Sequence, residues 1–342
     1  MREMKIIHVI TGMQKAAGTT TFVENVVTGL REMGHEVRIA MSKNEFEPCD
    51  VMHIHGLWSR LLHEAAVYAR AHKIPIVWST HGMTAPWAMR HKIWKKIPAW
   101  LLYQKSDLRK ATAIHCTTDQ EAKWNHRLGF ENCFVAPLGT NETIGSCTES
   151  KKGGRSRLLF VGRIYPVKGL VNLIKAWDLV LKSNAQIGKH WILRIVGPDQ
   201  AGHKAELERL SRKLDIWRSI EFVGPLYGED LSREYDSCDC LVLPSFTENF
   251  GGVIVDALAH GKPCIASSFT PWEELNEREC GWFVSNEPEN LAKAIRLMMN
   301  LSGTARKKFG ERGIELVKEK YMWGAVVSRI NNFYNSIIVK GA

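Results

Sequence analysis

The chain has 342 residues, 45% of them apolar and 24% charged, and its formal net charge is +10. This length suits two domains rather than one core, and no apolar run is long enough to predict a membrane-spanning helix. The stretch Ile6–Ile10 is too short for a secretory segment, so we expect a cytoplasmic protein, including at the inner face of the cell membrane. The charge indicates an anionic partner: nucleic acid, nucleotide phosphate or anionic lipid.

Short apolar runs alternate with helical stretches in the first half of the chain, an order typical of parallel sheets with crossover helices. The expected helices are Phe22–Met33, Ser59–His72, Pro98–Lys110 and Gln120–Leu128. The expected strands are Lys5–Ile10, Glu36–Met41, Asp50–His55, Pro75–Thr80, Ala113–Thr118 and Cys133–Pro137. We therefore predict an N-terminal Rossmann-like domain over residues 1–145.

The polar stretch Thr148–Ser156 has nothing to bury and is interpreted as the interdomain linker. The alternation then restarts, which predicts a second Rossmann-like domain over residues 155–320. Its expected strands are Arg157–Val161, His190–Val196, Ser219–Val223, Asp239–Pro244 and Pro263–Ser267, and its expected helices are Gly169–Leu181, Lys204–Leu214, Asp230–Ser237 and Val253–His260. Residues 321–342 form an amphipathic helix that we expect to cross back to the N-terminal domain.

The predicted fold class is thus α/β, with two doubly wound domains facing each other across a cleft. Ligands of such sheets bind beyond the carboxyl ends of the strands. Arg163 and Lys168 follow the first strand of the second domain, where two cations suit a diphosphate. Two solvated loop cations are the alternative interpretation.

A second motif runs from a strand through a loop with two glycines into a helix, where backbone N–H groups suit a phosphate. Glu248 lies in this loop and Asp256 on the new helix, so one carboxylate suits a sugar and the other a ribose. The alternative is a surface glutamate with an aspartate that stabilises the helix dipole.

Two features of the first domain lie after strands. The turn Gly12–Thr20 is placed where an open α/β sheet presents a phosphate-binding loop, but it fits neither the dinucleotide nor the P-loop pattern. His81 follows the carboxyl end of Pro75–Thr80 and is expected to point into the cleft. His53 and His55 alternate along one strand, which is more typical of structural histidines.

The spacing of Arg163 and Lys168, followed by Glu248 and Asp256 around a Glu-Asn-Phe-Gly-Gly run, resembles the retaining GT-B glycosyltransferases of family four. The likeness extends over nearly the whole chain. Thr270–Leu275 resembles a bacterial cell-envelope branch that makes lipopolysaccharide or capsule. The resemblance implies a hexosyltransferase that retains anomeric configuration and needs no metal or other cofactor, because the leaving diphosphate itself takes the acceptor's proton.

By this resemblance, Arg163 and Lys168 bind the donor diphosphate and Glu248 lies beside the donor sugar. The residues that would offer backbone N–H groups to sugar and phosphate are Asn249, Phe250, Gly251 and Gly252. Asp256 replaces the usual second glutamate, which holds the ribose hydroxyls, so the charge is kept and the reach is shorter by one methylene. That departure puts the ribose geometry in question.

Also by resemblance, His81 contacts the donor sugar and helps to orient the acceptor, and Gly18 lies in the donor-binding first turn. Ala17 stands where the family has another glycine. The implied partners are a nucleotide-sugar donor, UDP-sugar first and GDP-mannose second, and a glycan or lipid-linked acceptor.

The segment Trp87–Lys105 mixes cations and aromatic residues more densely than any other part of the chain. Such a segment can lie on an anionic membrane, resembles a surface that binds single-stranded nucleic acid, or is an ordinary amphipathic helix.

Two other functions compete with catalysis. One is a GT-B-fold binding partner of another transferase with weak or no turnover, and the other is a nucleic-acid binder. The sequence contains no nucleic-acid recognition motif, so we expect no nucleic-acid partner.

Overall fold

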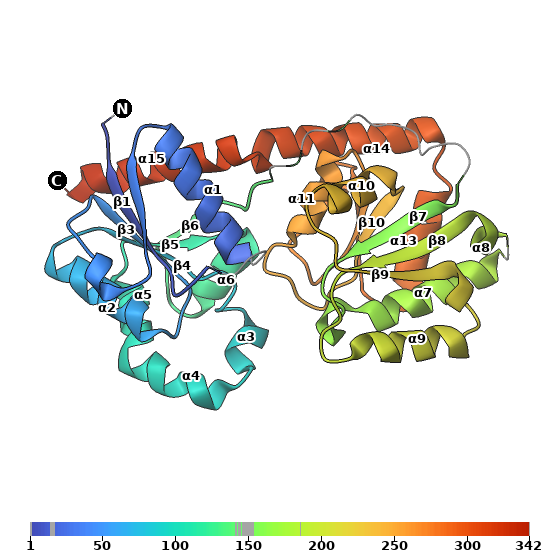
Figure 1. Ribbon diagram of the computed structural model, residues 1–342, viewed down its shortest axis with the longest axis horizontal. Helices are drawn as coiled ribbons and strands as arrows, with labels where there is room; N and C mark the ends of the chain where they lie inside the picture. The colour runs from blue at the N-terminus through green and yellow to red at the C-terminus, as the bar shows by residue number, and fades with distance from the viewer. Residues whose placement is uncertain are drawn as a thin grey trace. The chain divides into compact units, whose positions relative to one another are not determined.

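The computed structural model describes residues 2–13, 18–140, 142, 145, 154–184 and 186–341, without the side chains of 339–341. The chain divides into two compact units, which we call unit 1 (Met1–Gly139 with Met322–Ala342) and unit 2 (Thr140–Tyr321). Each unit contains a parallel six-stranded sheet with helices on both faces (Figure 1). The structure confirms the prediction of an α/β chain with two Rossmann-like domains.

The sheet of unit 1 has the strand order β2-β1-β3-β4-β5-β6. Its central strands are buried on both faces, which is why they form continuous apolar runs in the sequence. All six expected strands form, with shorter ends than predicted. They are β1 (Lys5–Val9), β2 (Glu36–Ala40), β3 (Val51–His55), β4 (Ile76–Ser79), β5 (Ala113–Cys116) and β6 (Cys133–Val135).

The helix expected over Pro98–Lys110 begins earlier, at Ile93, and contains a π-helical turn. Pro98 lies just before this turn and has no N–H to donate, which interrupts the regular hydrogen-bond pattern. The helical elements of unit 1 are α1 (Gly18–Glu32), η1 (Lys43–Glu45), α2 (Arg60–Ala71), α3 (Pro86–Arg90), α4 (Ile93–Ala99), η2 (Trp100–Gln104), α5 (Lys105–Lys110), α6 (Asp119–Arg127) and α15 (Trp323–Gly341).

The C-terminal helix α15 belongs to unit 1 and packs against α1. Gly29 of α1 makes this approach possible, because a Cβ at that position would lie 2.8 Å from Val327 Cγ2. Residues spaced three or four apart on α15 enter the same core as α1 and one face of the sheet. They are Trp323, Val326, Val327, Ile330, Tyr334 and Ile337.

The sheet of unit 2 has the strand order β12-β11-β10-β7-β8-β9. The last strand, β12, was missed in the sequence analysis because it is four residues long and follows a helix of a single turn. Gly281 begins it, and a Cβ there would lie 2.1 Å from Cys264 O of the neighbouring strand. The strands are β7 (Ser156–Val161), β8 (Trp191–Val196), β9 (Ile220–Gly224), β10 (Cys240–Leu243), β11 (Cys264–Ser267) and β12 (Gly281–Val284).

The boundary between the units lies at Gly139 and Thr140, so the described residues Thr140, Glu142 and Gly145 belong to unit 2 rather than to the N-terminal domain. Most of the expected linker, residues 148–153, lies outside the described residues. The helical elements of unit 2 are η3 (Pro166–Lys168), α7 (Leu170–Ser183), α8 (Ile187–His190), α9 (His203–Lys213), η4 (Trp217–Ser219), α10 (Glu229–Ser237), α11 (Gly252–Ala259), α12 (Glu274–Glu277), α13 (Pro288–Met299), α14 (Gly303–Leu316) and η5 (Val317–Tyr321).

Candidate functional site

The loops that follow β7 and β10 in unit 2 lie side by side, because these strands are neighbours in the sheet. Phe246 N donates to Val167 O at 2.8 Å and joins the two loops. Gly169 has a φ of 72°, and a Cβ there would lie 2.0 Å from Pro244 O. Only glycine allows this approach, so the chain is adapted to hold the two loops together at the carboxyl edge of the sheet.

Lys168 and Glu248, one from each loop, form an ion pair in which Nζ and Oε1 are 2.5 Å apart. Their side chains are only 16% and 13% exposed. The Ser245 hydroxyl donates to the same Oε1 at 2.8 Å, while Glu248 Oε2 has no protein partner in the described part of the chain. A free carboxylate oxygen beside an ammonium group suits a ligand that carries both hydroxyls and negative charge.

Arg163, the other expected diphosphate ligand, is exposed on the loop after β7. Its Nη1 donates to Gln200 Oε1 at 3.1 Å. Among residues 154–184 and 186–341, no hydrogen bond or ion pair joins it to Lys168 or Glu248. The structure thus brings Lys168 and Glu248 together and leaves the guanidinium beside Gln200.

The loop Asn249–Gly252 leads from Glu248 into α11. Gly251 has a φ of 81° and caps that helix. The Phe250 side chain is buried against Trp272, whose Nε1 donates to Phe250 O at 2.5 Å. The phenyl ring therefore anchors the loop in unit 2, and only the backbone of this residue is available to a ligand.

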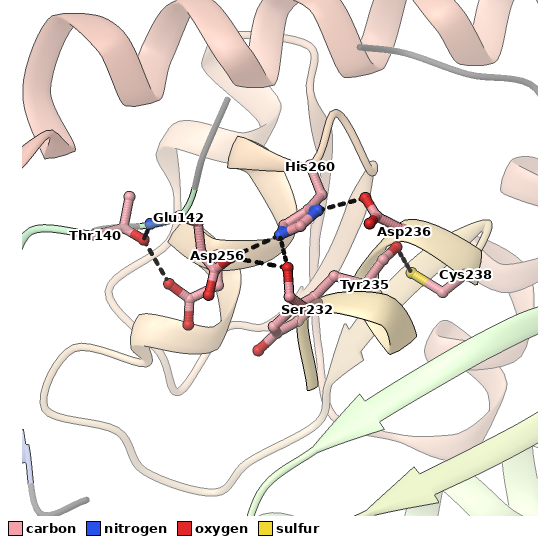
Figure 2. A network of polar contacts seen from close by, with 8 residues as sticks. All are labelled: Thr140, Glu142, Ser232, Tyr235, Asp236, Cys238, Asp256 and His260. Carbon is pink, nitrogen blue, oxygen red and sulfur yellow. Dashed lines mark hydrogen bonds and ion pairs between the residues drawn. The ribbon is translucent and has the colours of Figure 1, made fainter. Parts of the chain in front are cut away.

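Asp256, on α11, is half-buried and does not contact the ion pair. Its Oδ1 accepts a hydrogen bond from the Thr140 hydroxyl at 2.8 Å (Figure 2). Burial raises the pKa of Asp256 from its ordinary 3.8 to about 7; the Thr140 hydrogen bond lowers this pKa, the Glu142 carboxylate raises it and His260 lowers it. The Asp256 Oδ2 has no protein partner among the described residues.

His260, at the end of α11, lies between two carboxylates (Figure 2). Its Nδ1 is 2.7 Å from Asp236 Oδ1 and its Nε2 is 3.0 Å from Glu142 Oε2. The Ser232 hydroxyl also donates to Glu142 Oε2, at 3.2 Å. These contacts attach Thr140 and Glu142 to α10 and α11, which explains why the unit boundary precedes them. The sequence offered no signal for this network, because its contacting residues are up to 118 positions apart.

In unit 1, Gly18 begins α1, while residues 14–17 of the first turn lie outside the described residues. His81 follows β4 with a φ of 48°, a left-handed conformation that costs about 1 kcal/mol for a residue with a Cβ. The buried Glu121 holds this turn. Its Oε1 accepts from Gly82 N at 2.5 Å and from the Thr80 hydroxyl at 2.7 Å. The sequence offered no signal for Glu121.

Several polar residues lie beside His81 on one face of the sheet. His8 pairs in register with His53, His55 with Ser79, and Ser79 with His115. Paired residues of parallel strands share a face, and here that face is the one covered by α1 and α15. Two chains of hydrogen bonds result.

The first chain runs from α15 across the sheet. The Tyr334 hydroxyl is 2.5 Å from His53 Nδ1, His53 Nε2 is 2.6 Å from Ser79 Oγ, and Ser79 Oγ is 2.7 Å from His115 Nδ1. His115 Nε2 donates to Ala136 O at 2.8 Å. The Ala136 carbonyl can only accept, so His115 donates to it. Each of the other three hydrogen bonds is then donated by the group nearer Tyr334 to the group nearer Ala136. All four groups are then satisfied in their neutral forms.

The second chain consists of three histidines. His81 Nε2 is 3.0 Å from His55 Nδ1, and His55 Nε2 is 2.9 Å from His8 Nδ1. Burial is the main cause that lowers the pKa values of His8 and His81 to about 3; His115 contributes to both shifts, and the positive charge of Arg31 contributes to that of His8. These imidazoles are therefore neutral at physiological pH.

His8, His53 and His55 bring one ring nitrogen each within 4.8 Å of one another, close enough to hold a metal ion. Five of their six nitrogens already form hydrogen bonds with protein groups, His8 Nε2 being the exception. A metal would have to replace several of these bonds, so the geometry favours a hydrogen-bonded cluster over a metal centre.

Solved structures share this fold over nearly their whole length. Sucrose-phosphate synthase from Thermosynechococcus elongatus has a TM-score of 0.75 at 18% identity, covering 99% of this chain and 100% of that one. HepE of Anabaena, in complex with UDP-glucose, has 0.74 at 16% identity, covering 98% and 100%. WaaG, a glycosyltransferase involved in lipopolysaccharide biosynthesis, has 0.69 at 14% identity, covering 97% and 99%. These similarities define the GT-B fold.

Two sequence matches then identify the family. Residues 148–316 match the glycosyl transferases group 1, and residues 45–139 match the glycosyl transferase 4-like domain. The chain thus belongs to the group 1 glycosyltransferases, with a 4-like N-terminal domain.

Among curated relatives, an uncharacterised glycosyltransferase of Haemophilus influenzae is 26% identical over 61% of this chain and 59% of its own length. A D-inositol 3-phosphate glycosyltransferase of Geodermatophilus obscurus is 32% identical over 45% and 36%. The chain spans about half the length of the curated relatives that it matches. Among the described residues, none of the helices has the length and apolar character needed to cross a membrane.

Proposed function

We propose that this chain is a retaining glycosyltransferase that moves a sugar from a nucleotide-sugar donor to a cell-envelope glycan or lipid-linked acceptor. The observation that carries the proposal is the Lys168–Glu248 pair, held between two loops at the carboxyl edge of unit 2. This pair lies in the segment that matches the group 1 family. HepE, which shares the fold, was crystallised with UDP and UDP-glucose.

The ion pair has the chemistry that a sugar diphosphate needs. Lys168 Nζ has two more protons to donate and neutralises charge that develops on the leaving diphosphate. Glu248 Oε2 accepts from a hydroxyl of the donor sugar. Arg163 adds a second cation once its side chain leaves Gln200. Asp256 Oδ2 remains for the ribose, since Oδ1 is bound to Thr140.

The other candidate residues are proposed to bind the donor or to orient the acceptor. The backbone N–H groups of residues 249–252 bind sugar and phosphate oxygens at the start of α11. Gly18, at the start of α1, is proposed to lie near the donor. His81 contacts the donor sugar and orients the acceptor.

Transfer with retention needs no metal in this proposal. The bond from the sugar's anomeric carbon to the diphosphate oxygen breaks, the acceptor oxygen bonds to the same carbon on the same face, and the departing diphosphate takes the acceptor's proton. The protein contributes position and electrostatic stabilisation. We propose UDP-sugar as the first donor and GDP-mannose as the second, used in the cytoplasm.

The acceptor side is proposed to contact an anionic membrane through residues 87–105. Leu101 and Leu102 are 74% and 80% exposed, and Trp94 is 68% exposed. Lys92 and Lys95 are exposed among them. Apolar side chains interleaved with cations suit the boundary between lipid headgroups and acyl chains, where a lipid-linked acceptor would lie.

The competing function is a binding partner of another transferase that holds a nucleotide sugar without turnover. The aspartate at position 256 favours it, because the shorter side chain is bound to Thr140. A direct test measures release of nucleoside diphosphate from UDP-glucose and GDP-mannose in the presence of a membrane glycolipid extract. Release by the wild type and by Lys175→Ala, but not by Lys168→Ala, supports catalysis. Donor binding without release identifies the binding partner.

A further inference from the structure

We infer that His8 and His55 are positioning residues that fix the proton of His81 on its Nδ1, so that this histidine offers a donor to its ligand. The inference rests on the proposed function only for its effect on catalysis, because the position of the proton is a property of the free protein.

The two bonds of His55 cannot be set independently. A neutral imidazole carries one proton, so His55 donates through one nitrogen and accepts through the other. If the proton is on Nδ1, His55 donates to His81 Nε2 and accepts from His8 Nδ1. If it is on Nε2, both bonds reverse. The rings are neutral, since burial lowers the pKa of each one.

His8, at the buried end of the three-histidine hydrogen-bond chain, decides between these directions. His8 Nε2 is buried and has no hydrogen-bond partner among the described residues. When the hydrogen bonds are donated from His8 to His55 and from His55 to His81 (the outward direction), His8 Nε2 carries only a lone pair. When they are donated from His81 to His55 and from His55 to His8 (the inward direction), His8 Nε2 carries an N–H without an acceptor. A buried N–H without a partner is the rarer state in proteins.

Other groups packed around the chain do not reverse this choice. His53 stacks on His55 at 4.2 Å between centroids, but its own proton is committed to the bond with Ser79. Phe22 of α1 contacts His55 and His81 through its ring and offers no acceptor. His115 faces the same cluster with its proton committed to Ala136 O.

The outward direction places the proton of His81 on Nδ1, which has no protein partner among the described residues. His81 is half-buried, so this N–H is available to a ligand. It donates to an oxygen of the donor sugar or its phosphate. Because Nε2 is occupied by His55 and Nδ1 already has its proton, the residue does not remove a proton from the acceptor.

Long-range ¹H–¹⁵N correlation spectra of the full-length chain, labelled with ¹⁵N-histidine, test the inference without any donor. The chain has 13 histidines, so the His81→Gln variant identifies the signals of His81. We expect the Nδ1–H tautomer for His81 in the wild type. The Nε2–H tautomer or a doubly protonated ring would overturn the inference.

Two substitutions of His55 test the positioning role. His55→Leu removes the donor, so His81 loses its single tautomer and kcat falls about tenfold, the effect of one lost hydrogen bond. His55→Asn keeps an amide where Nδ1 was and restores both. The exposed His72→Asn serves as control. If His55→Leu leaves the tautomer of His81 unchanged, His55 has only a structural role and the positioning role is overturned. If the His55→Leu variant does not fold, the wild-type spectrum and the His55→Asn variant still test the inference. A chain with a fixed tautomer but no transfer would contradict only the proposed function.

Discussion

The Lys168 ammonium and the Glu248 carboxylate lie 2.5 Å apart although 80 positions separate them in the chain. Each follows a different strand, and the two strands are hydrogen-bonded neighbours in the sheet. Gly169 makes the approach possible, since a side chain there would collide with Pro244 O.

Replacing Glu248 by alanine removes the carboxylate proposed to bind the donor sugar. We expect transfer to fall about a hundredfold or more, as for a lost electrostatic contact in a transition state. The fold should persist, because the loop is also anchored by Phe250 and Trp272. Steady-state kinetics with circular dichroism check both. A Glu248→Ala enzyme with near-normal kcat/KM would refute the assignment.

Replacing Lys168 by alanine should weaken donor binding as well as turnover, because its charge stabilises phosphate in both the ground state and the transition state. Calorimetric titration with nucleoside diphosphate and kinetics measure the two effects separately. Lys175→Ala, an exposed lysine on α7, is the matched control. Equal donor affinities in the two variants would show that Lys168 does not bind the diphosphate.

The raised pKa of Asp256 predicts a pH-dependent stability difference. Its pKa is about 7 in the folded chain and 3.8 ordinarily, so between these pH values the folded state binds the extra proton. The free energy of unfolding therefore decreases as pH rises from about 4 to about 7, by up to about 4 kcal/mol from this group. Asp256→Asn does not titrate, so its melting temperature relative to wild type should be higher at pH 8 than at pH 5. A constant difference would contradict the prediction.

The exposed apolar residues of the segment 87–105 should mediate membrane contact. The double variant Leu101→Ser with Leu102→Ser should bind several-fold less to vesicles that contain phosphatidylglycerol, measured by sedimentation. Val67→Ser with Leu297→Ser removes two exposed apolar residues elsewhere and should bind like wild type. Equal binding by both double variants would argue against this surface.

The sequence predicted the two sheets because buried parallel strands are continuous apolar runs between helices of ordinary length. It also placed Lys168 and Glu248 correctly after strands, although their contact depended on the strand order. The four-residue strand β12 was missed because its neighbour α12 is too short to show a helical period.

The polar networks were not predictable in the same way. His260 meets Glu142 across 118 positions, and Tyr334 meets His53 across 281. No periodicity or motif links such pairs, since each contact depends on how helices pack on a finished sheet. His53 and His55 were interpreted from the sequence as structural histidines, and both are buried in the structure. The hydrogen bond between His55 and His81 was not predicted.

The most direct test of the donor site is a thermal-shift measurement on wild type and Lys168→Ala with UDP, GDP, ADP and their common sugars, in the presence of a chelator. We predict that one nucleotide series stabilises the wild type, since a ligand that binds only the native state raises the melting temperature, and that Lys168→Ala shows a smaller shift. No shift with any nucleotide, or equal shifts in the two proteins, would contradict a nucleotide-sugar site at the Lys168–Glu248 pair.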